Sequence, residues 1–246
     1  MLSKNQTKLI RSLNQKKYRY QLSLFVVEGI KSIREFLNSY YELHMLYTTD
    51  ISLFEVSSSR RTLITENELK KISFLTTPNK ALAVFKMCTT QIPANQGLVV
   101  ALDGVRDPGN MGTIIRLCDW FGIGHLICSP HTVDCYNPKV VQASMGSLAR
   151  VQVHYQDLTE FIRQQPSDLV YGTFMDGINV YTTALADQGL LILGNEANGI
   201  SSEVETLIHK RLAIPAFGTQ QQTESLNVAT AAAIFLSEFK RRAIEK

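Results

Sequence analysis

From Leu98 to Lys246 the chain repeats one pattern, in which a short apolar segment and a polar loop precede a segment with helical periodicity. Continuous apolar runs of this kind are typical of strands buried on both faces, as in the parallel sheets of α/β proteins. We therefore predict an α/β fold over 98–246, with a mainly parallel sheet covered by helices on both faces. The expected strands are 99–104, 125–130, 168–175, 190–196 and 210–215, and the expected helices are 110–122, 137–148, 201–208 and 225–242.

Residues 1–93 mix short helices with short strands and carry no evident catalytic motif. We expect them to form a separate, small α/β domain. Pro93 and Gly97 interrupt the periodicity, so we place a linker at 94–97. The expected helices of the first domain are 3–14, 29–38 and 66–72, and its expected strands are 24–28, 44–49 and 81–87.

The sequence gives no sign of export or membrane insertion. No apolar run approaches the ~20 residues that span a bilayer, and the polar N-terminus MLSKNQTKLIRSLNQ lacks the apolar core of a signal peptide. The four cysteines include no CxxC pair, which favours reduced thiols over a disulfide framework. We expect a cytoplasmic protein with no membrane segment.

One cluster has the residue types of a zinc site, since His125, Cys128, His131 and Cys135 fall within eleven residues. Segment 125–130 is an expected strand, however, and alternate side chains of a strand point to opposite faces, so His125 and Cys128 diverge. We favour packing and loop polarity for these residues and predict no metal site.

Basic residues are concentrated at the N-terminus, where six of them precede the first acidic residue, Glu28. In a helix over 3–14 the first three form one stripe, with leucines on the opposite side. Two interpretations stay open: a solvated helix face, or an arm that contacts phosphates. The candidate phosphate contacts are Lys4, Lys8, Arg11, Lys16, Lys17 and Arg19.

Three polar loops follow expected strands, where ligands bind in parallel sheets. They are 106–112, 194–201 and 217–227, and each is rich in Gly, Asn or Ser. The sequence contains neither GxGxxG nor GxxxxGK[ST], so the usual dinucleotide and triphosphate sites are not supported.

The first loop leads into a helix that carries a lone arginine among apolar residues, Arg116. Asn110 is a suitable N-cap for this helix, and small residues one turn before Arg116 leave room for a ligand. The structural alternative is a helical ion pair between Arg116 and Asp119.

Taken together, the loops have the order and spacing of a family signature. NxGxxxR at 110–116, LxLGNExxGIS at 191–201 and IP…G…SLNVAxAAAI at 214–234 resemble the three motifs of the SpoU (TrmH-like) RNA ribose methyltransferases of the SPOUT class. VEGIKSI at 27–33 is similar to a turn in the ribosomal-protein-like substrate-binding domain often attached to them. TQQQTE separates Gly218 from Ser225, a longer spacing than the family usually shows.

The resemblance implies a trefoil-knotted SPOUT fold for 98–246 and S-adenosylmethionine as the cofactor. In the family the cofactor is held largely by backbone groups of the second and third motif loops, and no metal is involved. By position, the cofactor-binding residues implied here are Thr173, Leu193, Gly194, Asn195, Glu196, Gly199, Ile214, Ser225 and Leu226.

The resemblance also implies the reaction, methylation of a ribose 2′-hydroxyl in rRNA or tRNA. Arg116 would act on the hydroxyl and so contact RNA, while Asn110 and Glu196 position it. Since an arginine guanidinium, with a pKa above ~12, is a poor base, we expect orientation rather than proton removal. The implied catalytic residues are Asn110, Arg116, Glu196, Ser225 and Asn227.

The family resemblance further implies a homodimer that binds RNA. The face formed by Ala229, Ala232, Ala233 and Leu236 suits a dimer interface, although an intramolecular core would explain it equally well. Two rival functions remain. One is a non-catalytic RNA-binding or ribosome-assembly protein with the same fold, and the other is a nucleotide-binding enzyme such as an oxidoreductase.

Overall fold

A computed structural model describes residues 2–89, 91, 97–218 and 225–244. The chain forms two compact units, and each unit is built from two separate segments of the sequence. Unit 1 comprises Met1–Thr89 and Asp134–Arg150, and unit 2 comprises Thr90–Val133 and Val151–Lys246. The expected division at 93–98 therefore does not account for 134–150, which was assigned to the second domain. Residues 94–96 of the expected linker lie outside the described residues.

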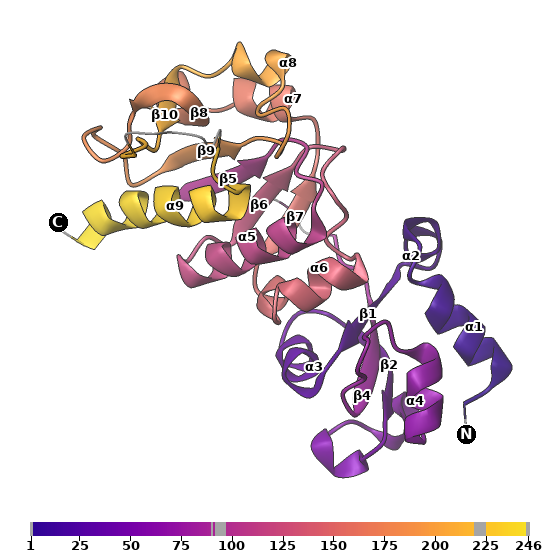
Figure 1. Ribbon diagram of the computed structural model, residues 1–246. Coiled ribbons are helices and arrows are strands. Elements are labelled where there is room, and N and C mark those ends of the chain that lie inside the picture. Colours follow the sequence, from indigo (N-terminus) through magenta and orange to yellow (C-terminus); the bar gives the residue numbers. More distant parts are fainter. Residues whose placement is uncertain (1, 90, 92–96, 219–224, 245–246) are drawn as a thin grey trace. The chain divides into compact units, whose positions relative to one another are not determined.

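Unit 1 is built on a four-stranded sheet in the order β1-β4-β2-β3 (Figure 1). β1 and β2 run antiparallel to β4, and β3 runs parallel to β2. Ile10, Leu13 and Ile72 pack with residues of three strands on one side, where α1 and α4 lie. The strands are β1 (Leu24–Glu28), β2 (Leu43–Thr48), β3 (Arg61–Leu63) and β4 (Ala81–Lys86), and the helices are α1 (Lys4–Ser12), α2 (Lys16–Leu22), α3 (Ile30–Leu37) and α4 (Glu66–Ile72).

The segment 134–150 completes unit 1. Its helix α6 (Pro138–Ala143) packs on β1, and Tyr136 joins an aromatic cluster in which its ring lies 4.6 Å from that of Phe25 and 6.3 Å from that of Tyr41. The Tyr136 hydroxyl also lies 3.2 Å from the Tyr41 hydroxyl. Part of the core of unit 1 is thus supplied from far along the sequence.

Unit 2 contains a six-stranded sheet in which every pair is parallel, in the order β10-β8-β9-β5-β6-β7. The expected α/β arrangement with a parallel sheet is confirmed, although β7 and α7 were not expected. The strands are β5 (Leu98–Leu102), β6 (His125–Cys128), β7 (Gln152–Tyr155), β8 (Val170–Asn179), β9 (Gly189–Leu193) and β10 (Lys210–Ala213).

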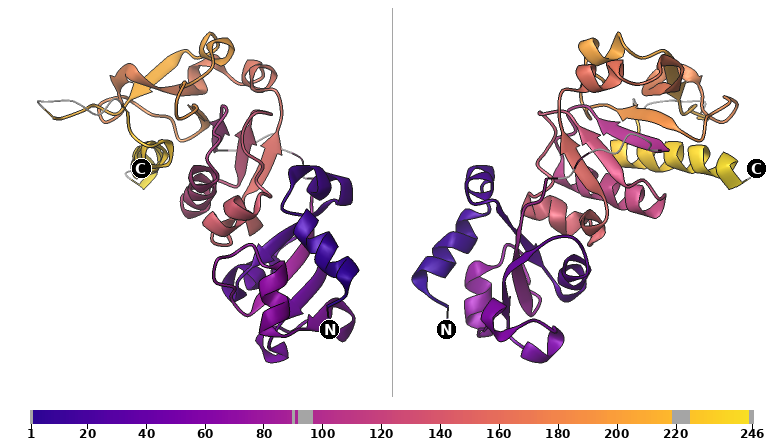
Figure 2. Two further views of the ribbon diagram at one scale, coloured as in Figure 1. Left: turned by 45° about the vertical axis from the view of Figure 1, so that its right-hand side comes forward. Right: turned by 180° about the vertical axis from the view of Figure 1, so that it is seen from behind.

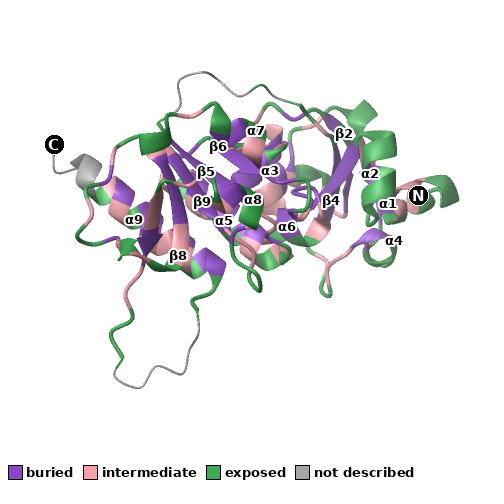
Figure 3. Cartoon of the chain, turned by 90° about the horizontal axis from the view of Figure 1, so that it is seen from above, coloured by how far each residue is buried: buried purple, intermediate pink, exposed green. Residues whose placement is uncertain are grey.

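Helices cover both faces of this sheet. α5 (Pro108–Trp120) and α9 (Val228–Ile244) lie side by side on one face, and α7 (Leu158–Arg163) and α8 (Ser202–Glu205) pack on the other (Figures 1 and 2). Figure 3 shows the strands largely buried between these layers. Two central strands, β5 and β9, are neighbours although β6, β7 and β8 separate them in the chain, so the loops after β5 and β9 meet at a topological switch point.

The proposed dimer face on α9 is used within the chain itself. Ala229, Ala232 and Leu236 are buried, and α9 packs against α5. The alternative of an intramolecular core therefore accounts for these residues. The trefoil knot stays a prediction, and within the described part of the chain no helix is long and apolar enough to cross a membrane.

Candidate functional site

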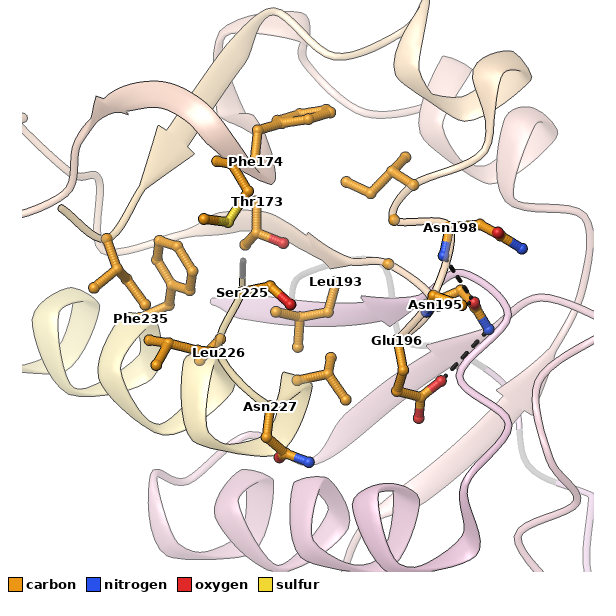
Figure 4. Close-up of a pocket in the computed structure, with 18 of the residues that line it drawn as sticks. Thr173, Phe174, Leu193, Asn195, Glu196, Asn198, Ser225, Leu226, Asn227 and Phe235 are labelled. Atoms are coloured by element: carbon orange, nitrogen blue, oxygen red, sulfur yellow. Dashed lines mark hydrogen bonds between the residues drawn. The ribbon is translucent and has the colours of Figure 1, made fainter. Parts of the chain in front are cut away.

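A cavity of about 590 Å³ opens beside the middle of β8, the carboxyl ends of β9 and β10 and the start of α9 (Figure 4). All nine residues predicted to bind the cofactor line it, and so does Asn227. Residues 219–224 of the long third loop lie outside the described residues. The other lining residues are Phe174, Met175, Ala197, Asn198, Ile200, Glu205, Arg211, Val228, Ala231 and Phe235.

The loop after β9 is held in a tight turn by Asn195. Its side-chain oxygen accepts hydrogen bonds from the amides of Ala197 (2.9 Å) and Asn198 (3.1 Å), and its Nδ2 donates to the Gly104 carbonyl (2.6 Å). A Cβ on Gly194 would lie 2.3 Å from the carbonyl carbon of Gly199. Gly194 is therefore required because the backbone of the turn leaves no room for a side chain, whether or not a ligand approaches it.

Glu196 connects this turn to the loop after β5. Its carboxylate accepts hydrogen bonds from the amides of Arg106 and Asp107 (both 3.3 Å) and from Nδ2 of Asn110 (2.9 Å). These donors stand at the N-terminus of α5, where the helix dipole also favours a negative charge. The carboxylate is therefore held by three donors of the first motif loop.

Asn110 connects in turn to the third loop. Nδ2 of Asn227 donates to the side-chain oxygen of Asn110 at 2.9 Å. The side-chain oxygen of Asn227 caps α9 by accepting a hydrogen bond from the amide of Ala229 at 2.9 Å. Asn110 does not cap α5, contrary to expectation. The N-cap is Asp107, whose carboxylate accepts from the Asn110 amide at 2.8 Å, because Pro108 occupies the first helical position. The freed side chain of Asn110 joins Glu196 to Asn227.

Arg116 is not part of this network. It is exposed on α5, does not line the cavity, and forms no hydrogen bond or ion pair with any other described residue. The structural alternative, a helical ion pair between Arg116 and Asp119, is therefore not formed among the described residues. Six helical positions turn the chain by about 600°, so Arg116 projects ~120° away from Asn110 and ~9 Å along the axis.

One wall of the cavity was not anticipated from the sequence. Arg211 on β10 lies between two carboxylates, with Asp176 at 2.6 Å and Glu205 at 2.5 Å, and its guanidinium carbon is 3.5 Å from the ring centroid of Phe174. The hydrogen bond from Arg211 lowers the pKa of Asp176 below its usual value. The available signal was an arginine within the expected strand 210–215, directly before its apolar residues.

In unit 1, Lys4, Lys8, Arg11, Lys16 and Lys17 are exposed, as a phosphate-contacting arm requires. Arg19 is an exception and corrects the prediction. It is 2 % exposed, and its Nε lies 2.9 Å from Oδ2 of Asp134. Its Nη1 also donates to the carbonyls of Leu13 and Asn14 at 2.9 Å. Arg19 is therefore a buried structural residue that is closed to RNA.

The residues weighed as a zinc site have other surroundings. Nδ1 of His125 lies 3.1 Å from Nε2 of His154, the two rings stack, and burial lowers the pKa of His125. Cys128 and Cys135 are buried. Among the described residues no three His, Cys, Asp or Glu side chains are grouped to hold a metal ion.

The motifs and the parallel sheet of unit 2 belong to a region that matches a known protein family. The model of the SpoU rRNA Methylase family matches residues 97–237, and that of the MRM3-like substrate binding domain matches residues 4–83. The chain belongs to the SpoU rRNA Methylase family, so the family recognition is confirmed.

Relatives and structural neighbours agree with this assignment. The chain is 29% identical over 234 residues to the 23S rRNA (guanosine(2553)-2'-O)-methyltransferase RlmP of Bacillus subtilis, with 92% of each chain covered. The structure of a TrmH-family protein from Porphyromonas gingivalis superimposes with a TM-score of 0.88 at 43% identity, covering 98% and 99% of the two chains. An rRNA methyltransferase from Sinorhizobium meliloti, solved with S-adenosylmethionine bound, gives a TM-score of 0.88 at 28% identity, covering 98% and 96%.

Proposed function

We propose that this protein transfers a methyl group from S-adenosylmethionine to a ribose 2′-hydroxyl of ribosomal RNA. The observation that carries the proposal is that the second and third motif loops line one cavity and that hydrogen bonds of Asn110 join the first motif loop to Glu196 and Asn227 of those two loops. The cavity volume of about 590 Å³ lies within the ~300–1,000 Å³ range of small-molecule sites. The cofactor bound by the Sinorhizobium meliloti relative supports the choice of methyl donor.

When bound, S-adenosylmethionine supplies an electrophilic methyl group on a sulfonium. The turn around Gly194 and the residues Ser225 and Leu226 would hold it, since both segments line the cavity. The N-terminus of α9, capped by Asn227, favours a carboxylate such as that of the methionine moiety. Thr173, whose hydroxyl donates to the Ile192 carbonyl at 3.1 Å, would form part of the same wall.

The network of Glu196, Asn110 and Asn227 would fix the acceptor side of the site. Arg116 would hold the ribose or an adjacent phosphate so that a lone pair of the 2′-hydroxyl faces the methyl carbon. Because arginine side chains remain protonated, this role is orientation and charge, and the proton would leave to water or phosphate.

Arg116 does not line the cavity of its own chain, so we propose that it acts at the cavity of a second copy in a homodimer. Its exposed position on α5 supports this arrangement, as does Trp120, which lies one turn further on the same helix with 84 % of its surface exposed. A Trp120→Glu variant should then be monomeric in light scattering and inactive. A Trp120→Glu variant that stays active as a monomer would refute the shared site.

The exposed lysines of α1 and α2 would contact RNA phosphates. Each lost phosphate contact should lower the slope of log K against log salt by about 0.7–0.9. We expect that effect from Lys8→Ala and not from Lys31→Ala, an exposed lysine on α3 that serves as the control. Equal slopes for the two variants would argue for the solvated-face interpretation.

Two relatives named above act on rRNA, which supports rRNA over tRNA as the substrate. Both relatives are bacterial proteins, which supports the cytoplasm as the place of action. The test is transfer of labelled methyl to undermodified rRNA and, separately, to tRNA. Arg116→Ala and Arg116→Lys should abolish or strongly reduce transfer, whereas Arg163→Ala, an exposed arginine on α7, should not. Binding of S-adenosylhomocysteine without transfer to either RNA would favour the non-catalytic alternative.

A further inference from the structure

Strand β8 leaves its ladder beside the cavity. Gly172 pairs with Arg211 of β10, and the next pair joins Ile178 to Leu212, so 173–177 have no partner in β10. This segment, which we call the β8 excursion, supplies Thr173, Phe174 and Met175 to the cavity wall. In Figure 4, Thr173 and Phe174 lie on the wall across the cavity from Asn227.

The excursion ends where β8 returns very close to the backbone of β10. A Cβ on Gly177 would lie 2.5 Å from the carbonyl carbon of Leu212 and 2.8 Å from that of Arg211, so any side chain there would require the strands to separate. The return point therefore depends on glycine. Between Gly172 and Gly177, the excursion is contacted by a side chain of β10.

Arg211 is the residue that holds it. One guanidinium nitrogen pairs with Asp176 of the excursion at 2.6 Å, and the other pairs with Glu205 of α8 at 2.5 Å. The plane of the same group stacks over Phe174 at 3.5 Å. A planar fork can make these three contacts at once, whereas a lysine ammonium can pair but cannot stack in this way.

These contacts contribute more to the shape of the wall than to stability. The side chains are 35% (Arg211), 76% (Asp176) and 43% (Glu205) exposed, and ion pairs at such exposure contribute little to folding. Phe174, Glu205 and Arg211 all line the cavity, so a change in this cluster alters the surface that a ligand meets.

We propose that Arg211 is a positioning residue for the methyl donor, acting through Phe174, which it holds against the cofactor cavity. The proposal rests on the proposed function, since it assumes that S-adenosylmethionine occupies this cavity. Among the described residues Arg211 forms its hydrogen bonds and ion pairs with Asp176 and Glu205, and none with Asn110, Arg116, Glu196 or Asn227, so its loss should weaken cofactor binding and leave the chemical step nearly intact.

The test measures S-adenosylhomocysteine affinity by calorimetry, together with KM and kcat for S-adenosylmethionine. We expect Arg211→Gln to raise Kd and KM about tenfold with kcat changed less than about threefold, and Arg211→Lys to be intermediate. Arg241→Gln, which removes the ion pair between an exposed arginine and the partly buried Glu238 on α9, is the matched control and should leave all three quantities unchanged.

A double-mutant cycle separates positioning from a general loss of structure. If Arg211 acts through Phe174, Arg211→Gln should add little to the loss already caused by Phe174→Ala. Additive losses, or a fall in kcat with KM unchanged, would overturn the proposal. Wild-type affinity in Arg211→Gln would also overturn it, whereas a wild-type protein that binds no S-adenosylhomocysteine would refute the proposed function itself. Should Arg211→Gln fail to fold, Arg211→Lys in the same cycle decides the question.

Discussion

The buried ion pair between Arg19 and Asp134 gives a prediction with a defined size. Arg19→Met keeps most of the side-chain volume but leaves the Asp134 carboxylate, 3% exposed, without its cation. Removing one partner of a buried pair costs about 3–5 kcal/mol because the remaining charge is uncompensated. With a urea dependence of about 1–3 kcal/mol per molar, the unfolding midpoint should fall by at least ~1 M. Circular dichroism in a urea titration measures this shift.

A second variant tests the stated cause. In Arg19→Met/Asp134→Asn the charge is gone, but the amide oxygen can still accept from the Tyr136 amide, which lies 3.1 Å from Oδ1 of Asp134. We expect the double variant to recover at least half of the lost stability. If it is as unstable as Arg19→Met, the uncompensated charge is not the cause. If Arg19→Met loses RNA affinity at unchanged stability, the assignment of Arg19 as a structural residue is wrong.

Three further predictions concern unit 2. Asn227→Ala should lose about 1 kcal/mol with the cap of α9, whereas Asn227→Asp should keep the cap and the stability but lose methyl transfer, since it has no donor for Asn110; equal activity of Asn227→Asp and wild type would contradict this role. Gly194→Ala should weaken S-adenosylhomocysteine binding at least tenfold, about 1.4 kcal/mol, because its Cβ displaces the turn, and calorimetry would show unchanged affinity if the turn can adjust. Burial lowers the pKa of His125, so the unfolded chain binds a proton at this residue more readily than the folded chain does. The stability that depends on neutral His125 is therefore fully present above about pH 6.5 and is lost as the pH falls through the folded-state pKa. His125→Gln should therefore lose less stability than wild type between pH 7.5 and 5 in urea titrations, and parallel losses would contradict the assignment.

The sequence predicted the parts of the protein that follow local rules. Apolar strands and turn residues predicted the sheet of unit 2, because strand formation depends on neighbours within a few positions. The residues expected around the cofactor came from the resemblance of three motifs to a family and not from local rules. Contacts between distant segments were not predictable in the same way. The burial of Arg19 depends on Asp134, which is 115 positions away in the sequence. The basic residues around Arg19 suggested instead that its side chain is exposed to solvent.

The same limit applies inside the site. The motif spacing identified Asn110 and Glu196. Asp107-Pro108 is itself a sequence signal for a helix start, which the expected start at Asn110 overlooked, whereas the contact of the Asn110 side chain with Asn227 depends on a residue 117 positions away. Nor can it show that 173–177 leave the ladder, since a residue count within one strand does not give its register against another. The wall formed by Arg211 and Phe174 follows from that register.

The contribution of 134–150 to unit 1 bears on how such proteins exchange modules. The region that matches the methyltransferase family supplies α6 and Tyr136 to the core of the unit that matches the substrate-binding family. In a chimera that takes only residues 1–89 from a relative, the incoming segment would have to pack against the α6 of this chain. The residue in place of Arg19 would also have to pair with the Asp134 of this chain. An exchange of the substrate-binding unit therefore has to replace both segments, 1–89 and 134–150, through three junctions in the chain.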